Sequence, residues 1–124
     1  MIHLFLVMLG GALGSGARYG VGRASLAVLG PGYPWGTLTV NLAGGFAMGL
    51  LAGLVGRFVS GEEWRLLLGV GVLGGFTTFS AFSLEVANMI ERGTIGTAAL
   101  YAVVSVVGSV AALFIGLALA RGFA

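Results

Sequence analysis

Three hydroxyl side chains in the last apolar stretch of the sequence stand four residues apart: Tyr101, Ser105 and Ser109. In an α-helix this spacing puts all three on one face, in a line about 12 Å long. Such a line can form hydrogen bonds to a neighbouring helix, or it can offer them to a small polar species moving along it. The pattern predicts either helix packing or a permeation track, and both interpretations stay open.

Asn41 lies at the centre of another apolar stretch, and Thr37 precedes it by one helical turn on the same face. An amide in such surroundings destabilises the protein unless it has a hydrogen-bond partner. The partner can be a second helix or a small ion.

Phe79 and Phe82 are three residues apart, so they share a helix face. Aromatic rings have a negative face and a positive edge, so the edges of two rings can hold a small anion without a fixed cation. Packing of the rings against lipid or protein is the alternative interpretation.

Two charged residues fall deep in apolar stretches. Glu85 is a functional candidate because an acidic residue inside a membrane segment usually has a function. It either lies in a vestibule or pairs with an arginine. Arg18 either draws anions toward a pore entrance or extends its side chain to the lipid headgroups. The sequence has no cysteine and no visible nucleophile and base pair, so we do not expect an enzyme.

The segment from Gly74 to Ser80 (GGFTTFS) joins glycines, threonines and a serine in the middle of an apolar stretch. These residues are poor or neutral helix formers, so we expect a helix that is broken near its middle. Unwound backbone at this depth is tolerated where it lines a cavity, and its carbonyl oxygens are the usual ligands of alkali ions. A kinked helix whose threonines bond to the preceding turn is the alternative.

These residues lie in a chain of 124 residues that is 58% hydrophobic and 8% charged. A membrane-spanning helix needs about 20 apolar residues, so the length allows four spans and no soluble domain. We expect an all-α membrane protein with a single transmembrane domain over residues 1–124, with spans at about 2–29, 36–57, 63–91 and 95–120. Ser60 and Glu63 have the capping-box spacing that starts a helix.

The six arginines are scattered and form no stripe for nucleic acid. With four spans, three of them fall on each side of the membrane: Arg18, Arg23 and Arg92 on one, and Arg57, Arg65 and Arg121 on the other. An excess of positive charge on the cytoplasmic side normally sets the orientation. The balance therefore indicates either a weak bias hidden by short termini or a dual-topology chain that forms an antiparallel homodimer.

Three motifs together resemble the CrcB/Fluc family of fluoride channels, across essentially the whole chain. They are the stretches 10–19 (GGALGSGARY), 36–41 (GTLTVN) and 74–83 (GGFTTFSAFS). The resemblance implies a passive, fluoride-selective channel of the bacterial plasma membrane that exports cytoplasmic fluoride. It also implies an antiparallel dimer with two pores and a structural sodium ion on the dimer axis.

The resemblance also implies roles for individual residues. Phe79 and Phe82 match the aromatic residues of the pore, and Asn41 matches an asparagine that donates to fluoride. The polar track is matched by Thr37, Tyr101, Ser105 and Ser109. The backbone carbonyls of Gly74 and Thr77 match the sodium site, while Glu85 and Arg18 match residues of the vestibule and the pore entrance.

The alternative function is a small dual-topology antiporter that exchanges protons for a drug or another cation. Such a transporter needs a membrane carboxylate, usually in the first span, and residues 1–29 contain no Asp or Glu. Glu85 is the only acid deep in a span. A subunit that assembles with other proteins and moves no ion is a third interpretation.

Overall fold

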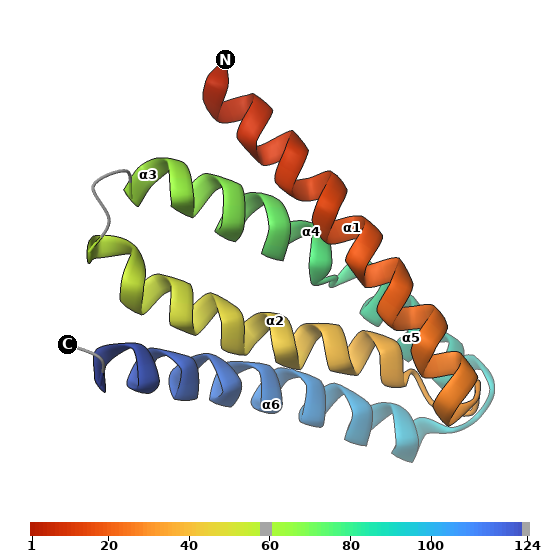
Figure 1. Cartoon of the computed structure of the whole chain (residues 1–124). Coiled ribbons are helices and arrows are strands. Elements are labelled where there is room, and N and C mark those ends of the chain that lie inside the picture. The colour runs from red at the N-terminus through yellow and green to blue at the C-terminus, as the bar shows by residue number, and fades with distance from the viewer. Residues whose placement is uncertain (58–60, 123–124) are drawn as a thin grey trace.

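The computed structural model of the chain describes residues 1–57 and 61–122, which form helices joined by short turns (Figure 1). The chain begins with α1 (Ile2–Leu29) and ends with α6 (Ile95–Gly122). The second helix, α2 (Trp35–Leu54), continues into a short 3₁₀ turn, η1 (Val55–Arg57). Regular α-helix therefore ends three residues before the predicted boundary at residue 57.

The third long segment is built of four helical pieces: α3 (Gly61–Trp64), the π-helix η2 (Arg65–Leu73), α4 (Gly74–Phe76) and α5 (Ser80–Glu91). Ser60, the predicted cap of this segment, lies outside the described residues.

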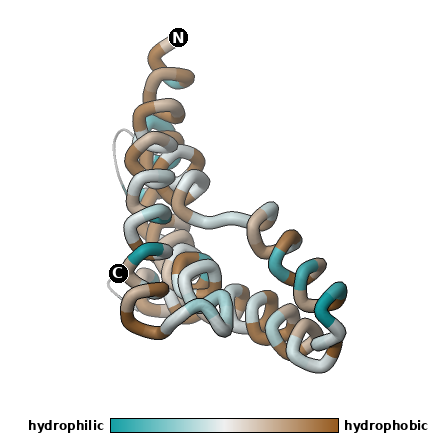
Figure 2. The backbone as a smooth tube through the Cα atoms, turned by 90° about the vertical axis from the view of Figure 1, so that its right-hand side faces the viewer, coloured by the Kyte–Doolittle hydropathy of each residue, from teal (hydrophilic) through white to brown (hydrophobic). Residues whose placement is uncertain are grey.

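Four stretches among residues 1–57 and 61–122 are long and apolar enough to cross a bilayer: Ile2–Leu29, Trp35–Leu54, Gly61–Glu91 and Ile95–Gly122. Their mean hydropathy rises from 1.3 in the first to 2.5 in the last. Hydrophobic and neutral residues run along the helices, and strongly hydrophilic positions are few (Figure 2). The prediction of an all-helical protein with four membrane-spanning helices is confirmed, and the chain is a multi-pass membrane protein.

Glycines bring α2 and α6 together along most of their length (Figure 1). A Cβ atom on Gly45 would lie 2.8 Å from the carbonyl oxygen of Ser109, and one on Gly49 would collide with the backbone of Leu113. From the other side, a Cβ atom on Gly116 would collide with the carbonyl oxygen of Phe46. Small residues let membrane helices approach backbone to backbone, where van der Waals contact holds them together.

The same device joins α1 to the third segment, which α1 crosses at a clear angle (Figure 1). A Cβ atom on Gly10 would lie 2.8 Å from the amide nitrogen of Val72, and one on Gly75 would lie 2.6 Å from the carbonyl oxygen of Gly11. This contact anchors η2 and α4, so α1 supports the chain directly before the third segment changes direction.

The third segment leaves the helical path at Thr77, whose backbone is extended, and becomes helical again at Ser80. The hydroxyl of Thr77 donates to the carbonyl of Leu73 at 2.9 Å, which closes the last turn of α4. The Thr78 hydroxyl accepts from the amide of Ala81 at 3.1 Å, which caps the start of α5. We call Thr77–Phe79 the break; it confirms the prediction of a bent third helix, and it directs α5 away from α4 (Figure 2).

Candidate functional site

A cavity of about 500 Å³ lies beside the break, and we call it the break cavity. Its walls come from α2, from the break and its flanking residues, and from α6: Asn41, Gly44, Gly45, Met48, Gly74, Thr77, Thr78, Phe79, Phe82, Ser105, Val106, Ser109, Val110 and Leu113. None of these described lining residues is charged. The cavity combines apolar walls with amide, hydroxyl and ring-edge groups, which is a lining suited to a small polar species rather than to a large charged one.

Asn41 reaches from α2 to the backbone of the break. Its Nδ2 donates to the carbonyl of Thr78 and its Oδ1 accepts from the amide of Thr78, both at 2.9 Å. The interhelical bond weighed as one interpretation of Asn41 is therefore present, although its partner is backbone rather than a side chain. Asn41 also lines the break cavity, so a role toward an ion is compatible with this contact.

The three hydroxyls of α6 divide into two groups. Ser105 and Ser109 line the break cavity, whereas the fully buried Tyr101 donates its hydroxyl to Glu85 Oε1 at 2.8 Å. The Ser105 Oγ is buried and has no hydrogen-bond partner among the described residues. A buried hydroxyl without a partner is costly, so this atom needs a ligand or a water molecule in the cavity.

Phe79 and Phe82 lie side by side at the cavity, with ring centroids 5.5 Å apart and planes tilted by 45°. Phe82 is buried and also contacts Tyr101, with centroids 5.2 Å apart. Phe79 precedes α5 instead of lying within it, and its side chain is 74% exposed in the single chain. The two rings are neighbours, as the spacing predicts. The Phe82 ring is held by its surroundings, whereas the Phe79 ring is free to contact lipid or another protein chain.

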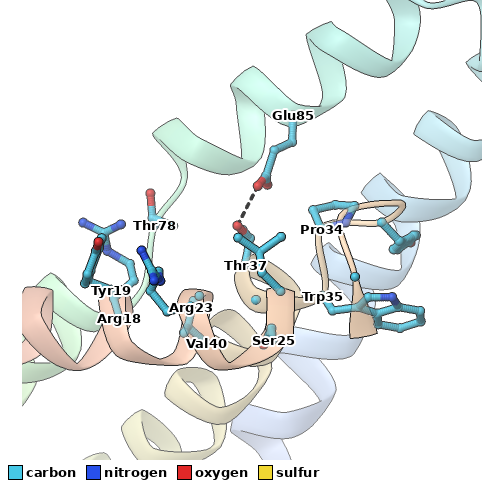
Figure 3. Close-up of a pocket in the computed structure, with 15 residues that line it drawn as sticks. Arg18, Tyr19, Arg23, Ser25, Pro34, Trp35, Thr37, Val40, Thr78 and Glu85 are labelled. Atoms are coloured by element: carbon cyan, nitrogen blue, oxygen red, sulfur yellow. Dashed lines mark hydrogen bonds between the residues drawn. The ribbon is translucent and has the colours of Figure 1, made fainter. Parts of the chain in front are cut away.

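A second cavity, of about 320 Å³, opens near the C-terminal half of α1, and we call it the mouth cavity. Figure 3 shows Arg18, Tyr19 and Arg23 of α1 on one side of it, with Thr37 and Glu85 beside them. Thr78 lines both cavities, so the break forms part of the wall of each.

Glu85 projects from α5 toward α2 and α6, where both of its carboxylate oxygens accept hydrogen bonds. Thr37 donates to Oε2 at 2.9 Å, as drawn in Figure 3, and Tyr101 donates to Oε1 at 2.8 Å. Of the two roles weighed from the sequence, the position in a vestibule fits the mouth cavity. The partners of the carboxylate are hydroxyl groups, and among the described residues no arginine pairs with it.

Arg18 lines the mouth cavity and also contacts the third segment, because its Nε donates to the carbonyl of Gly75 at 3.2 Å. Gly75 lies in α4, whose carbonyls have lost the donors of the next helical turn at the break. The guanidinium group therefore satisfies one end of α4 while it leaves positive charge near the cavity. The sequence interpretations of this residue did not include that bond.

The carbonyl groups of Gly74 and Thr77 have the character that a sodium ion requires. In a continuous helix the Gly74 carbonyl would accept from the amide of Thr78, which donates to Asn41 instead. The Thr77 carbonyl would accept from the amide of Ala81, which donates to the Thr78 hydroxyl. Both oxygens are thus released from the helical ladder, and hard carbonyl oxygens are suitable ligands for an alkali ion.

Two residues that sequence reasoning left without a role contribute to the site. Thr78 supplies the backbone that Asn41 holds and the hydroxyl that caps α5. Tyr33, in the turn between α1 and α2, packs edge-on against Tyr101 with centroids 5.4 Å apart, and burial raises the pKa of its hydroxyl. An aromatic residue two positions before a helix start was the only signal for Tyr33, and the position of Thr78 within the break has no signal of its own.

Comparison with known proteins identifies relatives over nearly the whole chain. Residues 5–117 match the model of the family described as CrcB-like protein, Camphor Resistance (CrcB). A protein of Phenylobacterium zucineum named fluoride-specific ion channel FluC is 62% identical over 98% of this chain and 97% of its own length. Proteins of the same name from Novosphingobium aromaticivorans and Caulobacter vibrioides are each 55% identical, over 95% and 98% of this chain and 95% and 97% of their own lengths.

These relatives are named as ion channels and not as enzymes, and they cover the motifs at residues 10–19, 36–41 and 74–83 on which the resemblance was based. The family predicted from the sequence is confirmed: the chain belongs to the CrcB family.

Proposed function

We propose that the chain is a passive fluoride-selective channel of the bacterial plasma membrane that exports fluoride from the cytoplasm. The observation that carries this proposal is the break cavity, where the described lining residues are uncharged and the buried Ser105 hydroxyl has no protein partner. The names of the similar proteins support the same conclusion.

Fluoride is small and holds its water tightly, so a pore must replace that water with closely placed hydrogen-bond donors. The hydroxyls of Ser105 and Ser109 and the amide of Asn41 are donors of this kind, and the ring edges of Phe79 and Phe82 add positive partial charge. Because no arginine lies in the described lining, a fluoride ion meets no deep electrostatic trap and can leave again.

The driving force needs no chemical reaction. The cytoplasmic side of a bacterial membrane is negative, so each exported anion gains about 2.3 kcal/mol per 100 mV. A passive channel is therefore enough to expel fluoride that entered as neutral HF, and Arg18 and Arg23 would attract the anion to the mouth cavity.

We further propose that the active form is an antiparallel homodimer with two pores, in which each chain is one transmembrane domain. The high exposure of Phe79 at the level of the break supports a partner that closes the cavity, and the equal distribution of arginines supports insertion in both orientations. The released carbonyls of Gly74 and Thr77 in two chains would hold one structural sodium ion on the dimer axis.

Efflux from liposomes tests this function. Purified protein is reconstituted in vesicles loaded with potassium fluoride or potassium chloride, valinomycin releases the voltage, and ion-selective electrodes follow both anions. We expect fast fluoride release without chloride release, and its loss in Phe82→Ile and Asn41→Asp. Ile115→Val, a change at an exposed position of α6 outside both cavity linings, is the control that retains release. No fluoride release by the unmodified protein would refute the channel.

Glu85→Gln separates the channel from a proton-coupled antiporter. Gln keeps one acceptor and one donor toward the Thr37 and Tyr101 hydroxyls. Fluoride efflux should therefore stay within about tenfold of the unmodified rate, because about tenfold corresponds to the loss of a single charge-assisted hydrogen bond. An antiporter would instead lose all transport, because its only deep carboxylate could no longer exchange protons. Initial rates in vesicles with and without a pH gradient give the answer.

A further inference from the structure

The contact between Asn41 and Thr78 consists of two hydrogen bonds that run in opposite directions. The amide nitrogen donates to the Thr78 carbonyl and the amide oxygen accepts from the Thr78 amide, both at 2.9 Å. Rotating the amide by 180° would turn both bonds into repulsive contacts, so this pair fixes the orientation of the Asn41 side chain. The amide offers a donor and an acceptor side by side, whereas Leu can make neither bond, Ser has only one oxygen, and an ionised Asp lacks the donor.

This pair replaces a bond that a regular helix would make. The Thr78 amide is the helical donor for the Gly74 carbonyl, four residues earlier. Because Asn41 accepts from that amide, the Gly74 carbonyl oxygen lies outside the backbone ladder. The side chain of α2 thus acts as the partner that the third segment lacks at the break.

A second contact from α2 supports the same geometry. Gly44 lies three residues after Asn41 on the same face, and a Cβ atom there would collide with the side-chain methyl of Thr77. Thr77 is therefore seated directly on the backbone of α2, while its hydroxyl is bonded to Leu73. One face of α2 holds two consecutive residues of the break.

We propose that Asn41 is a positioning residue: its amide holds the third segment unwound at Thr78 and so keeps the Gly74 carbonyl available as a ligand for a monovalent cation. The position of Phe79, the next residue along the chain, depends on the same contact. The part of this proposal that concerns the cation rests on the proposed function, in which sodium is structural. The contact itself does not depend on it.

The first test follows hydrogen exchange of the Thr78 amide by NMR, using protein labelled with ¹⁵N-threonine in lipid nanodiscs. In Asn41→Leu we expect the exchange rate at Thr78 to rise about tenfold or more, because both bonds of the pair are lost. Asn41→Asp keeps an acceptor for the amide and should leave Thr78 clearly better protected than Asn41→Leu does. Ser109→Ala, which changes the cavity but does not touch the break, should leave exchange at Thr78 within about twofold of the unmodified protein.

The second test measures how sodium stabilises the purified protein against heat, with potassium as the comparison ion. Asn41→Leu should raise the sodium concentration for half-maximal stabilisation by about tenfold, because the break is no longer held and the Gly74 carbonyl is no longer fixed in position for the ion. Thr78→Val keeps the backbone pair but removes the hydroxyl that occupies the Ala81 amide, which can then return to the Thr77 carbonyl. This variant should weaken sodium binding while the amide at position 78, followed with a ¹⁵N-valine label, still exchanges slowly. It tests the same proposal if Asn41→Leu fails to fold.

If the Thr78 amide exchanged at the same rate in Asn41→Leu and in the unmodified protein, the claim that the two Asn41 hydrogen bonds hold the break would be refuted. Faster exchange with an unchanged sodium midpoint would overturn the link to the Gly74 carbonyl. These results are independent of transport: if the unmodified protein released no fluoride from liposomes, the proposed function would fail and the exchange data would still decide the role of Asn41.

Discussion

Both oxygens of the Glu85 carboxylate are occupied by hydroxyl donors that come from two other helices. A carboxylate at this depth is stable only when hydrogen bonds compensate for the water it has lost. Thr37 of α2 and Tyr101 of α6 supply them, and Tyr101 is itself held by ring contacts with Tyr33 and Phe82. The acid therefore connects α5 with α2 and α6 at the wall of the mouth cavity.

Tyr101→Phe tests this arrangement because it removes only the donor to Glu85 and keeps the ring. We expect the free energy of unfolding in detergent to fall by about 1–3 kcal/mol, the usual effect of leaving a partly buried carboxylate without one of its hydrogen-bond partners. Chemical denaturation followed by tryptophan fluorescence measures the change.

Tyr33→Phe is the matched control for this change. It also removes one hydroxyl from a ring that packs on the same cluster, but no hydrogen bond of that hydroxyl is found in the described part of the chain. Equal destabilisation by the two substitutions would contradict a specific role for the bond between Tyr101 and Glu85.

Single residues were the hardest level to predict from the sequence. The types of residue at the site were recognisable, because polar groups in apolar stretches are conspicuous. Their partners were not: Asn41 bonds to backbone 37 residues away, and Arg18 bonds to a carbonyl 57 residues away. A sequence pattern shows that a buried polar group needs a partner, but it cannot show which backbone group the fold leaves without one.

At the scale of the elements, glycines decide which helices are neighbours. The contact between α2 and α6 depends on Gly45, Gly49 and Gly116, where any side chain would meet backbone. Backbone cannot move aside as a flexible side chain can, so substitution here forces the two helices apart. That movement would also change the separation of Asn41 and Ser105, which both line the break cavity.

Gly49→Ala should therefore destabilise the protein by about 1–3 kcal/mol or more through overpacking. Gly20→Ala is the matched control: it lies within α1, where an added Cβ atom meets open space, and it should be neutral or stabilise by about 0.5–1 kcal/mol through the better helix propensity of alanine. Thermal unfolding of both variants at one detergent concentration makes the comparison. Similar melting temperatures for the two variants would show that α2 and α6 can move apart without a loss of stability.

The spans and the bend were predictable at this scale, whereas the π-helix was not. Long apolar stretches predict membrane helices because the bilayer requires a minimum length, and the glycines and threonines of residues 74–80 predict interruption because they favour the helix poorly. The π-helix η2 (Arg65–Leu73) depends on hydrogen bonds between residues five apart. Neither composition nor hydropathy indicates which carbonyl accepts a hydrogen bond from a given backbone amide.

For the whole molecule, the six arginines divide evenly, three and three, between the two sides predicted from the sequence. Arg57 and Arg121 lie at one end, where Arg57 donates to the carbonyl of Ala120 at 3.1 Å, and Arg92 lies at the other, after α5. Because the arginine count is equal on the two sides, the positive-inside rule indicates no orientation for this chain. This balance is what an antiparallel pair of identical chains requires.

Two fusions at the C-terminus test the orientation, one with a reporter that is active only in the cytoplasm and one with a reporter that is active only outside. We expect both to be active. Gly32→Arg, in the turn between α1 and α2, should then favour one reporter and lower fluoride efflux per chain, because one orientation becomes scarce. Activity of a single reporter in the unmodified protein would exclude insertion in both directions.

The lengths of the helices have a consequence for the surrounding lipid. α1 and α6 have 28 residues each, about 42 Å at 1.5 Å per residue, whereas α2 has 20, about 30 Å, close to the thickness of the hydrocarbon layer. A helix that is longer than the hydrocarbon layer is thick can fit by tilting. The axis of α1 is strongly tilted relative to the axes of α2 and α6 (Figure 1). Because α1 also holds the chain beside the break through Gly75, we expect the acyl-chain length of the lipid to influence the shape of the break cavity.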